Sequence, residues 1–216
     1  MKMGCAGPAG SGEANLPPCA PSRRTVDAFT RALHALLALS FVGAYSTRES
    51  ELFGWVHVTL GYTMGGLLLM RLAWGLAGPR HARLSALLGK LRVLRTWSRG
   101  VGKLQVVCMA FSVVVLLLVI APVVVTGYVA KHELTGEWME AVHEFFGNFL
   151  LLAFLAHVGA VIVFSLLRRR NLAVPMLTGR AAGPGPDLIR CNHVFFAVLL
   201  LGSVLSFWVW QWQHAW

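Results

Sequence analysis

The stretch from Met139 to Arg170 constrains the fold most strongly. It begins with acidic residues, continues with more than twenty mostly apolar ones and ends on three arginines. An α-helix crosses a bilayer in about 20 residues, at a rise of about 1.5 Å per residue, so this stretch predicts a membrane-spanning helix. It contains His143 and His157, which are fourteen residues apart. That spacing places both rings within about 40° of one helix face and about 21 Å apart along the axis. Because polar side chains are costly in lipid and are usually partnered or functional, we interpret the two as ligand positions.

The composition extends this interpretation to the whole chain. Of the 216 residues, 56% are hydrophobic and only 13% are charged, whereas soluble domains are about a quarter charged. The net charge of +10 does not predict nucleic-acid binding, because the positive residues lie between apolar runs instead of forming a soluble basic surface. We therefore predict an all-α integral membrane bundle of five transmembrane helices, with a four-helix core. The predicted spans are about 27–45, 55–76, 104–128, 139–170 and 192–212.

The remaining segments predict the domain organisation. Residues 1–24 are rich in Gly, Pro, Ala and Ser, and predict a disordered cytoplasmic tail. Residues 25–180 then form the four-helix domain, and residues 181–216 form a linker and the fifth helix. One interpretation of the strongly basic segment 79–103 is an amphipathic helix that lies at the membrane interface. Segment 171–190, with its prolines and glycines, predicts a loop.

Lysine and arginine are concentrated on one side of the predicted membrane. With the N-terminus inside, seventeen of the 19 lie on or near the inner side, and only Arg48 and Lys131 lie outside. Because cytoplasmic loops carry an excess of Lys and Arg, this distribution predicts a cytoplasmic N-terminus and a periplasmic C-terminus. Six glutamates fall on the outer side.

This topology gives each of four histidines a depth in the membrane. His57 and His143 both lie toward the outside, and His34 and His157 both lie toward the inside. Two imidazoles at one depth on facing helices suit axial ligation of one b-type haem, and helix-bundle cores hold such cofactors. We therefore predict a haem-binding core with one haem for each pair.

Other residues on the same helix faces support the haem interpretation. Gly61 and Gly147 each follow an outer histidine by four residues, which leaves room for a porphyrin face against the backbone. Arg71 lies fourteen residues after His57, at the inner level, where it would pair with a haem propionate. Two alternatives stay open. A lone histidine also hydrogen-bonds across helices, and small residues pack at any span interface. A zinc or copper site also stays open, although a closed zinc site needs four clustered ligands and these four histidines are split between two levels.

Three segments resemble the bacterial b561-type cytochromes b, which include the b-type subunits of nickel–iron hydrogenases. The segments are RTVDAFTRALH (24–34), WVHVTLGYTMGGLLLMRLAWGLAGPRHARL (55–84) and VHEFFGNFLLLAFLAHVGAVIVFSLLRRRNLAVPMLTGR (142–180). The resemblance implies a four- or five-span protein that binds two haems b through histidines of the first, second and fourth spans. By position, these ligands are His34, His57, His143 and His157. The fifth span departs from the four-span, superoxide-oxidising type.

The resemblance also implies a function. Such proteins lie in the bacterial inner membrane and pass electrons between the quinone pool of a respiratory chain and a periplasmic partner, often a c-type cytochrome or a hydrogenase. With histidine at both axial positions, haem iron has no free site for oxygen or substrate, which favours electron transfer over bond chemistry. Two other functions stay open. One is an outer-face oxidoreductase that acts on superoxide or a small reductant, with quinone as acceptor. The other is a haem-free membrane scaffold or metal transporter.

Overall fold

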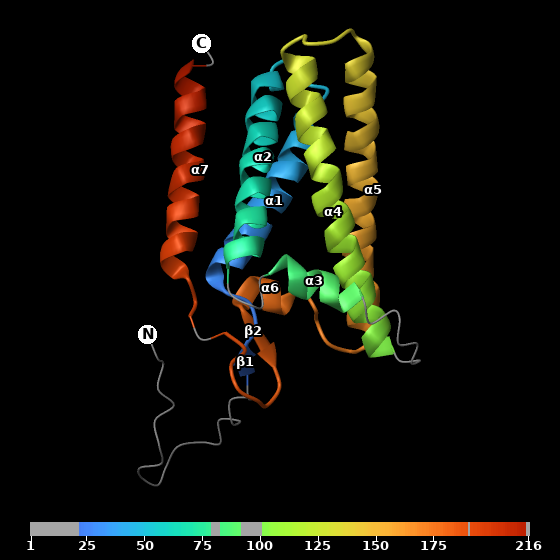
Figure 1. The fold of residues 1–216 in the computed structure, drawn as a ribbon, viewed down its shortest axis with the longest axis vertical. Helices are drawn as coiled ribbons and strands as arrows, with labels where there is room; N and C mark the ends of the chain where they lie inside the picture. The colour runs from blue at the N-terminus through green and yellow to red at the C-terminus, as the bar shows by residue number, and fades with distance from the viewer. Residues whose placement is uncertain (1–21, 79–82, 92–100, 190, 215–216) are drawn as a thin grey trace, which may run out of the picture.

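A computed structural model describes residues 22–78, 83–91, 101–189 and 191–214 of the chain. Its long helices run up and down in alternation, and the last one lies beside the others (Figure 1). The bundle consists of α1 (Ala28–Thr47), α2 (Gly54–Ala77), α4 (Val101–Lys131) and α5 (Trp138–Leu167), with α7 (Val194–His214) packed on α1 and α2. The Trp208 indole N–H donates to the Thr63 hydroxyl oxygen at 2.9 Å and so fixes α7 against α2.

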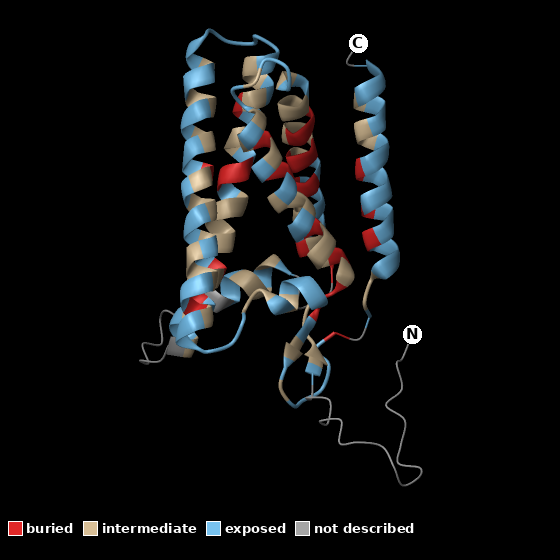
Figure 2. Cartoon of the chain, turned by 180° about the vertical axis from the view of Figure 1, so that it is seen from behind, coloured by how far each residue is buried: buried red, intermediate tan, exposed pale blue. Residues whose placement is uncertain are grey.

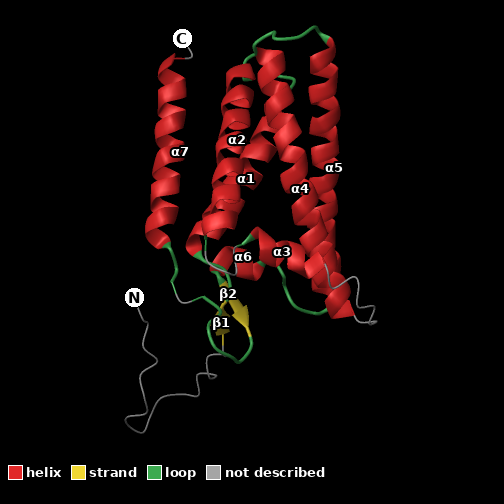
Figure 3. Ribbon diagram, viewed as in Figure 1, coloured by secondary structure: helices red, strands yellow, loops and turns green. Residues whose placement is uncertain are grey.

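The two ends of the bundle differ in structure (Figure 3). At one end, which we call the sheet end, lie β1 (Ser22–Arg24), α3 (Leu84–Leu91), α6 (Val174–Thr178) and β2 (Arg180–Ala182). At the opposite end, which we call the hairpin end, residues 48–53 join α1 to α2 and residues 132–137 join α4 to α5.

Four helices are long and apolar enough to cross a membrane: α1, α4 from Gly102, α5 and α7. The chain is thus an all-α membrane helical bundle, as the sequence predicts. The 24-residue helix α2 is not among the four. It is packed between α1, α4 and α7, and its buried side chains include Thr59 and Thr63, whose hydroxyls bond to carbonyls of their own helix. The count of five spans therefore stays a prediction.

The bundle core lies midway between the two ends. Buried positions gather on α1 and α2 (Figure 2), and one cluster joins all four bundle helices through Phe41, Met64, Leu68, Val119, Ile120 and Leu150. Between membrane helices, such side chains stabilise the bundle through van der Waals packing. Leu150 is seven residues from both His143 and His157, so this apolar layer separates the two levels of histidines.

Asp27 is the N-cap of α1. Asp27 has an extended backbone, and its carboxylate accepts from the Thr30 backbone N–H at 2.7 Å. Such a cap satisfies a backbone donor that the first turn of a helix leaves unpaired.

Two predictions for the connecting segments are wrong. Residues 22–24, predicted to belong to the disordered tail, form β1, and segment 171–190, predicted as a loop, contains α6 and β2. The strands pair antiparallel, with Ser22 opposite Ala182, because this pairing satisfies backbone groups that neither segment could satisfy alone. The rest of the predicted tail lies outside the described residues. Within the basic segment 79–103, the described residues 84–91 form the helix α3.

Candidate functional site

Two of the predicted histidines meet at the hairpin end. His57 is in the first turn of α2, and His143 is in the second turn of α5. Their ring centres are 6.0 Å apart and the ring planes are perpendicular, at 90°. The structure therefore brings together the two side chains that the sequence placed at the same depth.

The Nδ1 atom of His57 lies 2.8 Å from the main-chain carbonyl oxygen of Ala44 on α1. A carbonyl oxygen only accepts hydrogen bonds, so this nitrogen carries the ring proton and donates it. The Nε2 atom then keeps its lone pair, which is the form of imidazole that binds a metal.

His143 is held in the same way by α4. Its Nδ1 lies 3.1 Å from the Val123 carbonyl oxygen and 3.2 Å from the Thr126 hydroxyl oxygen. The Thr126 hydroxyl donates its own hydrogen to the Pro122 carbonyl at 2.7 Å, so toward His143 it can only accept. Both acceptors therefore place the ring proton on Nδ1 and leave Nε2 of His143 as the metal-binding nitrogen.

A glycine of α4 allows the His143 ring to lie this close to the helix. A Cβ atom at Gly127 would be 2.8 Å from Cε1 and 3.1 Å from Nδ1 of His143. These distances are shorter than a carbon contact of about 3.5–4.0 Å. Any larger residue at this position would push the imidazole away from its Val123 acceptor.

Gly61 and Gly147, predicted to leave room beside the outer histidines, have open space at the Cβ position. A Cβ built on either residue has no heavy atom within 4 Å. The other glycines of these two helices are not all alike: a Cβ at Gly65 would lie 2.9 Å from the Val124 side chain, whereas Gly66 and Gly159 also have no heavy atom within 4 Å. The space beside both histidines thus fits a flat group against the backbone.

The second predicted pair, His34 and His157, lies toward the sheet end. His157 Nδ1 is 2.9 Å from the Ser112 hydroxyl oxygen. Ser112 donates to the Met109 carbonyl at 3.0 Å, so it accepts from His157 and again leaves Nε2 without the proton.

His34 is held less firmly. Its side chain is exposed, and among the described residues we find no hydrogen bond to it. It lies close enough to His157 for the two rings to interact electrostatically. Among the described residues, the His57 and His143 rings are in contact, whereas no ring contact joins His34 and His157, so the inner pair is less closely placed than the outer pair.

Arg71, predicted to pair with a propionate, is a half-buried residue on α2 toward the sheet end. The Asp27 carboxylate acts on it electrostatically, and its Nη1 lies 3.3 Å from the position that a Cβ of Gly75 would take. Its role toward a propionate stays a prediction.

The geometry at the hairpin end suits two ligands on opposite sides of one metal. A histidine nitrogen binds a metal at about 2.0 Å, so two such imidazoles have ring centres about 6 Å apart. Within the part of the chain that the structure describes, no group of three or more His, Cys, Asp or Glu is placed to hold a metal ion. Haem supplies four equatorial nitrogens itself and needs two axial ligands at most from the protein, so the pairs fit haem.

The partners of the histidines were not predicted from the sequence. Ser112, Val123, Thr126 and Gly127 all lie on α4, which carries no candidate ligand itself. Main-chain carbonyls have no signature in the sequence, and small residues are common in membrane helices. Only the prolyl residue Pro122, one turn before Thr126, marks this part of α4 as unusual.

Comparison with known proteins identifies a matching family model. A family model described as prokaryotic cytochrome b561 matches residues 25–179, a range that contains α1, α2, α4, α5 and both histidine pairs but not α7. No curated protein and no solved structure matches the chain.

Proposed function

The chain belongs to the prokaryotic cytochrome b561 family, and we propose that it binds two haems b and carries electrons across the bilayer between the quinone pool and a periplasmic redox partner. Family membership indicates a membrane b-type cytochrome that transfers electrons. The number of haems, the quinone and the partner are our proposals.

One observation supports this proposal most strongly, the meeting of His57 and His143. Their ring centres are at the separation expected for two axial ligands of one metal, 6.0 Å. Hydrogen bonds from Nδ1 fix the tautomer of each ring, so both Nε2 atoms are ready to bind. Because both side chains are already held in place, binding the metal costs little further side-chain entropy.

His34 and His157 support a second haem. They are at the other level of the same bundle, with Leu150 and its neighbours between the levels. On α5 the two levels are about 21 Å apart along the axis, which is most of a hydrocarbon core of about 30 Å. Two redox groups at these levels would connect the two sides of a membrane.

Haem b held by two histidines would supply reversible one-electron chemistry with no open coordination position. The chain contributes the rest. It orients the imidazoles of His57, His143 and His157 through Nδ1, keeps the ring proton off their binding nitrogens, and leaves space at Gly61 and Gly147 for the flat group.

The charges at the two ends support an orientation and a kind of partner. The glutamates of the hairpin end are all exposed: Glu49, Glu51, Glu133, Glu137, Glu140 and Glu144. The sheet end carries basic residues, among them Arg83, Lys103, Arg168, Arg169, Arg170 and Arg180. Because basic residues favour the cytoplasmic side, we place the hairpin end in the periplasm of the bacterial inner membrane. Exposed glutamates there would attract a cationic redox protein.

The haem content of the purified full-length protein tests the proposal. A pyridine haemochrome assay is expected to give two haems b per chain, and quinol is expected to reduce them. One haem per chain would remove one of the two pairs. A colourless protein that carries zinc or copper would contradict the proposal and favour a metal transporter or scaffold.

The same protein tests the oxidoreductase alternative. Fast haem reduction by superoxide or a small reductant, with no protein partner, would favour that alternative. The structure offers little to attract an anion at this end, since Arg48 is paired with Glu49 at 2.8 Å and bonded to Asn148 at 2.9 Å. We therefore expect slow reduction by superoxide.

A further inference from the structure

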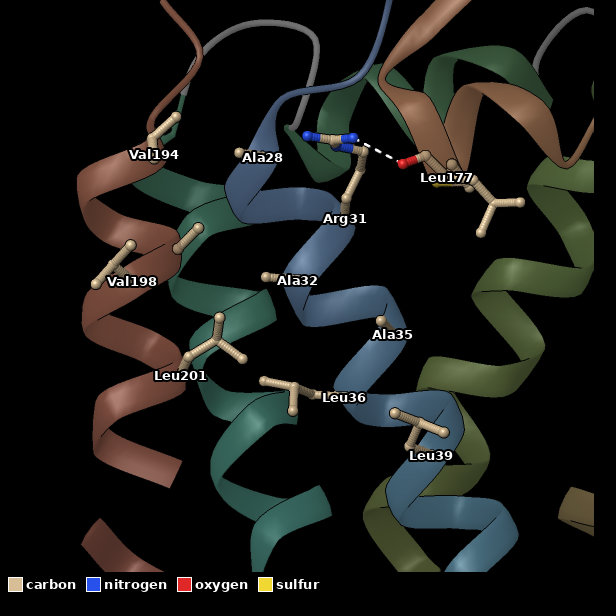
Figure 4. Close-up of a pocket in the computed structure, with 12 residues that line it drawn as sticks. Ala28, Arg31, Ala32, Ala35, Leu36, Leu39, Leu177, Val194, Val198 and Leu201 are labelled. Carbon is tan, nitrogen blue, oxygen red and sulfur yellow. Dashed lines mark hydrogen bonds between the residues drawn. The ribbon is translucent and has the colours of Figure 1, made fainter. Parts of the chain in front are cut away.

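A groove runs between α1, α6 and α7 at the sheet end (Figure 4). Its cavity volume is about 520 Å³. Small and aliphatic side chains line it, such as Ala32 and Ala35 of α1 and Val198 and Leu201 of α7. Of the described residues that line it, Arg31 is the single charged one.

The Arg31 guanidinium is only partly satisfied by the protein. One N–H, on Nη1, donates to the Leu177 carbonyl oxygen of α6 at 2.8 Å, as Figure 4 shows. Its Nε is buried and has no hydrogen-bond partner. Among the described residues we find no carboxylate in an ion pair with Arg31, although Asp27 is one turn away on the same helix. The carboxylate of Asp27 instead caps α1 and acts on Arg71. A buried donor beside an unbalanced positive charge favours an anionic ligand.

The length of the groove matches one leaflet of a bilayer. Along α1 its lining residues run from Ala28 to Leu39. Eleven residues of helix are about 16 Å long, which is close to half of a hydrocarbon core of about 30 Å. Arg31 is near the membrane surface end of this path, and the rest of it is apolar. The groove therefore suits a molecule with a charged head and a long apolar tail.

The surroundings of Arg31 add to the positive charge. Arg23 and Arg24 of β1 and Arg180 of β2 lie at the same end of the bundle. The nearby Asp187 is engaged by the backbone N–H of Arg24 at 2.6 Å. Basic pockets between membrane helices are typical sites for anionic lipid head groups.

We propose that the groove between α1 and α7 binds one anionic phospholipid of the leaflet at the sheet end, with its phosphate at Arg31 and an acyl chain along Ala32, Ala35 and Leu39. A quinone is a poorer fit to the same groove, because its head carries no negative charge to balance the guanidinium. The bound lipid would fill the space between α7 and the four-helix bundle. This proposal does not depend on haem or on electron transfer.

Lipid retention by the full-length protein tests this site. Native mass spectrometry after addition of phosphatidylglycerol or phosphatidylcholine is expected to show preferential binding of phosphatidylglycerol. Arg31→Gln is expected to weaken phosphatidylglycerol binding about fivefold, since one Arg near the surface contributes about 1 kcal/mol to anionic lipid binding. Arg31→Lys keeps the charge and is expected to retain most of the preference.

Arg168→Gln is the matched control. Arg168 carries the same charge at the same end of the bundle, but it follows α5 and donates to Gln105 of α4 at 2.6 Å, away from the groove. It is expected to leave phosphatidylglycerol binding unchanged.

Ala35→Phe tests the apolar path without changing charge. Ala35 is exposed in the groove, and a phenyl ring there would take the place of the acyl chain. We expect this variant to lose both lipids while keeping the haem content of the unmodified protein. Equal binding of the two lipids, equal losses in Arg31→Gln and Arg168→Gln, or a quinone retained through Arg31 would each overturn the proposal. Because haem content is measured separately, a failure of the lipid site is distinguishable from a failure of the proposed cytochrome function.

Discussion

At the hairpin end, main-chain carbonyls of Ala44 and Val123 orient the two imidazoles, whose ring centres are 6.0 Å apart. At the sheet end, a side-chain hydroxyl of Ser112 orients His157, while the exposed His34 has no hydrogen bond within the described residues. A substitution can remove a hydroxyl but cannot remove a carbonyl of the backbone. The hairpin-end site is therefore built into the helix packing, and the sheet-end site depends on one side chain.

The comparison also assigns a role to α4, which carries no histidine among the predicted ligands. It orients His143 through Val123 and Thr126, and it orients His157 through Ser112. Ligands on α5 are thus held by the helix that packs most closely against it. A hydrogen bond from the non-binding nitrogen to a neighbouring group fixes the tautomer and direction of a metal-binding ring.

The largest expected effect comes from removing a ligand. His57→Ala or His143→Ala is expected to lower the haem content from two per chain to one, and His34→Ala or His157→Ala is expected to remove the other haem. The pyridine haemochrome assay measures this, with His214→Ala at the end of α7 as control. Retention of both haems by any of the four variants would remove that residue from the ligand set.

Ser112→Ala is expected to have the next largest effect. It removes the one hydrogen-bond acceptor of His157, and loss of such a contact weakens metal binding by about 10–100-fold. Haem titration of the haem-depleted protein measures the affinity at each site. The control is Ser203→Ala on α7, since the Ser203 hydroxyl bonds only to the Leu199 carbonyl of its own helix. An unchanged haem affinity at the sheet end would show that this site does not depend on the Ser112 hydroxyl.

Gly127→Ala tests the close approach at the hairpin end. The added methyl would lie 2.8 Å from Cε1 of His143, and overpacking of this kind costs about 1–3 kcal/mol. We expect about tenfold weaker haem binding at the hairpin end and no change at the sheet end. Gly159→Ala, on α5, is the matched control because a Cβ there has no heavy atom within 4 Å.

Thr126→Val is expected to have the smallest effect. It removes one of two acceptors of the His143 ring and leaves the Val123 carbonyl in place, so we expect a loss of about threefold in haem affinity, within the range for one hydrogen bond. The same titration measures it. A loss as large as that of Ser112→Ala would break the comparison between the two sites.

Much of the fold is predictable from the sequence, because apolar runs bounded by charges fix where membrane helices begin and end. The sequence also predicts the depth of each histidine, and the ring centres of His57 and His143 lie 6.0 Å apart, while the ligand roles of the four histidines stay predictions. The Asp27 cap was also predictable, since a side-chain oxygen just before an apolar run is typical of a helix start.

Other features depend on contacts between distant segments. The pairing of Ser22 with Ala182 joins two three-residue strands about 160 residues apart, and neither segment carries an alternating pattern. The acceptors of the histidines include the main-chain carbonyls of Ala44 and Val123, which any residue would provide.

The most direct test of the pairing compares two double variants in the same haemochrome assay. If His57 and His143 bind one haem between them, His57→Ala/His143→Ala keeps one haem per chain, like each single variant, whereas His34→Ala/His57→Ala keeps none. The opposite result, with no haem in the first and one haem in the second, would contradict the pairing and with it the two-level electron path.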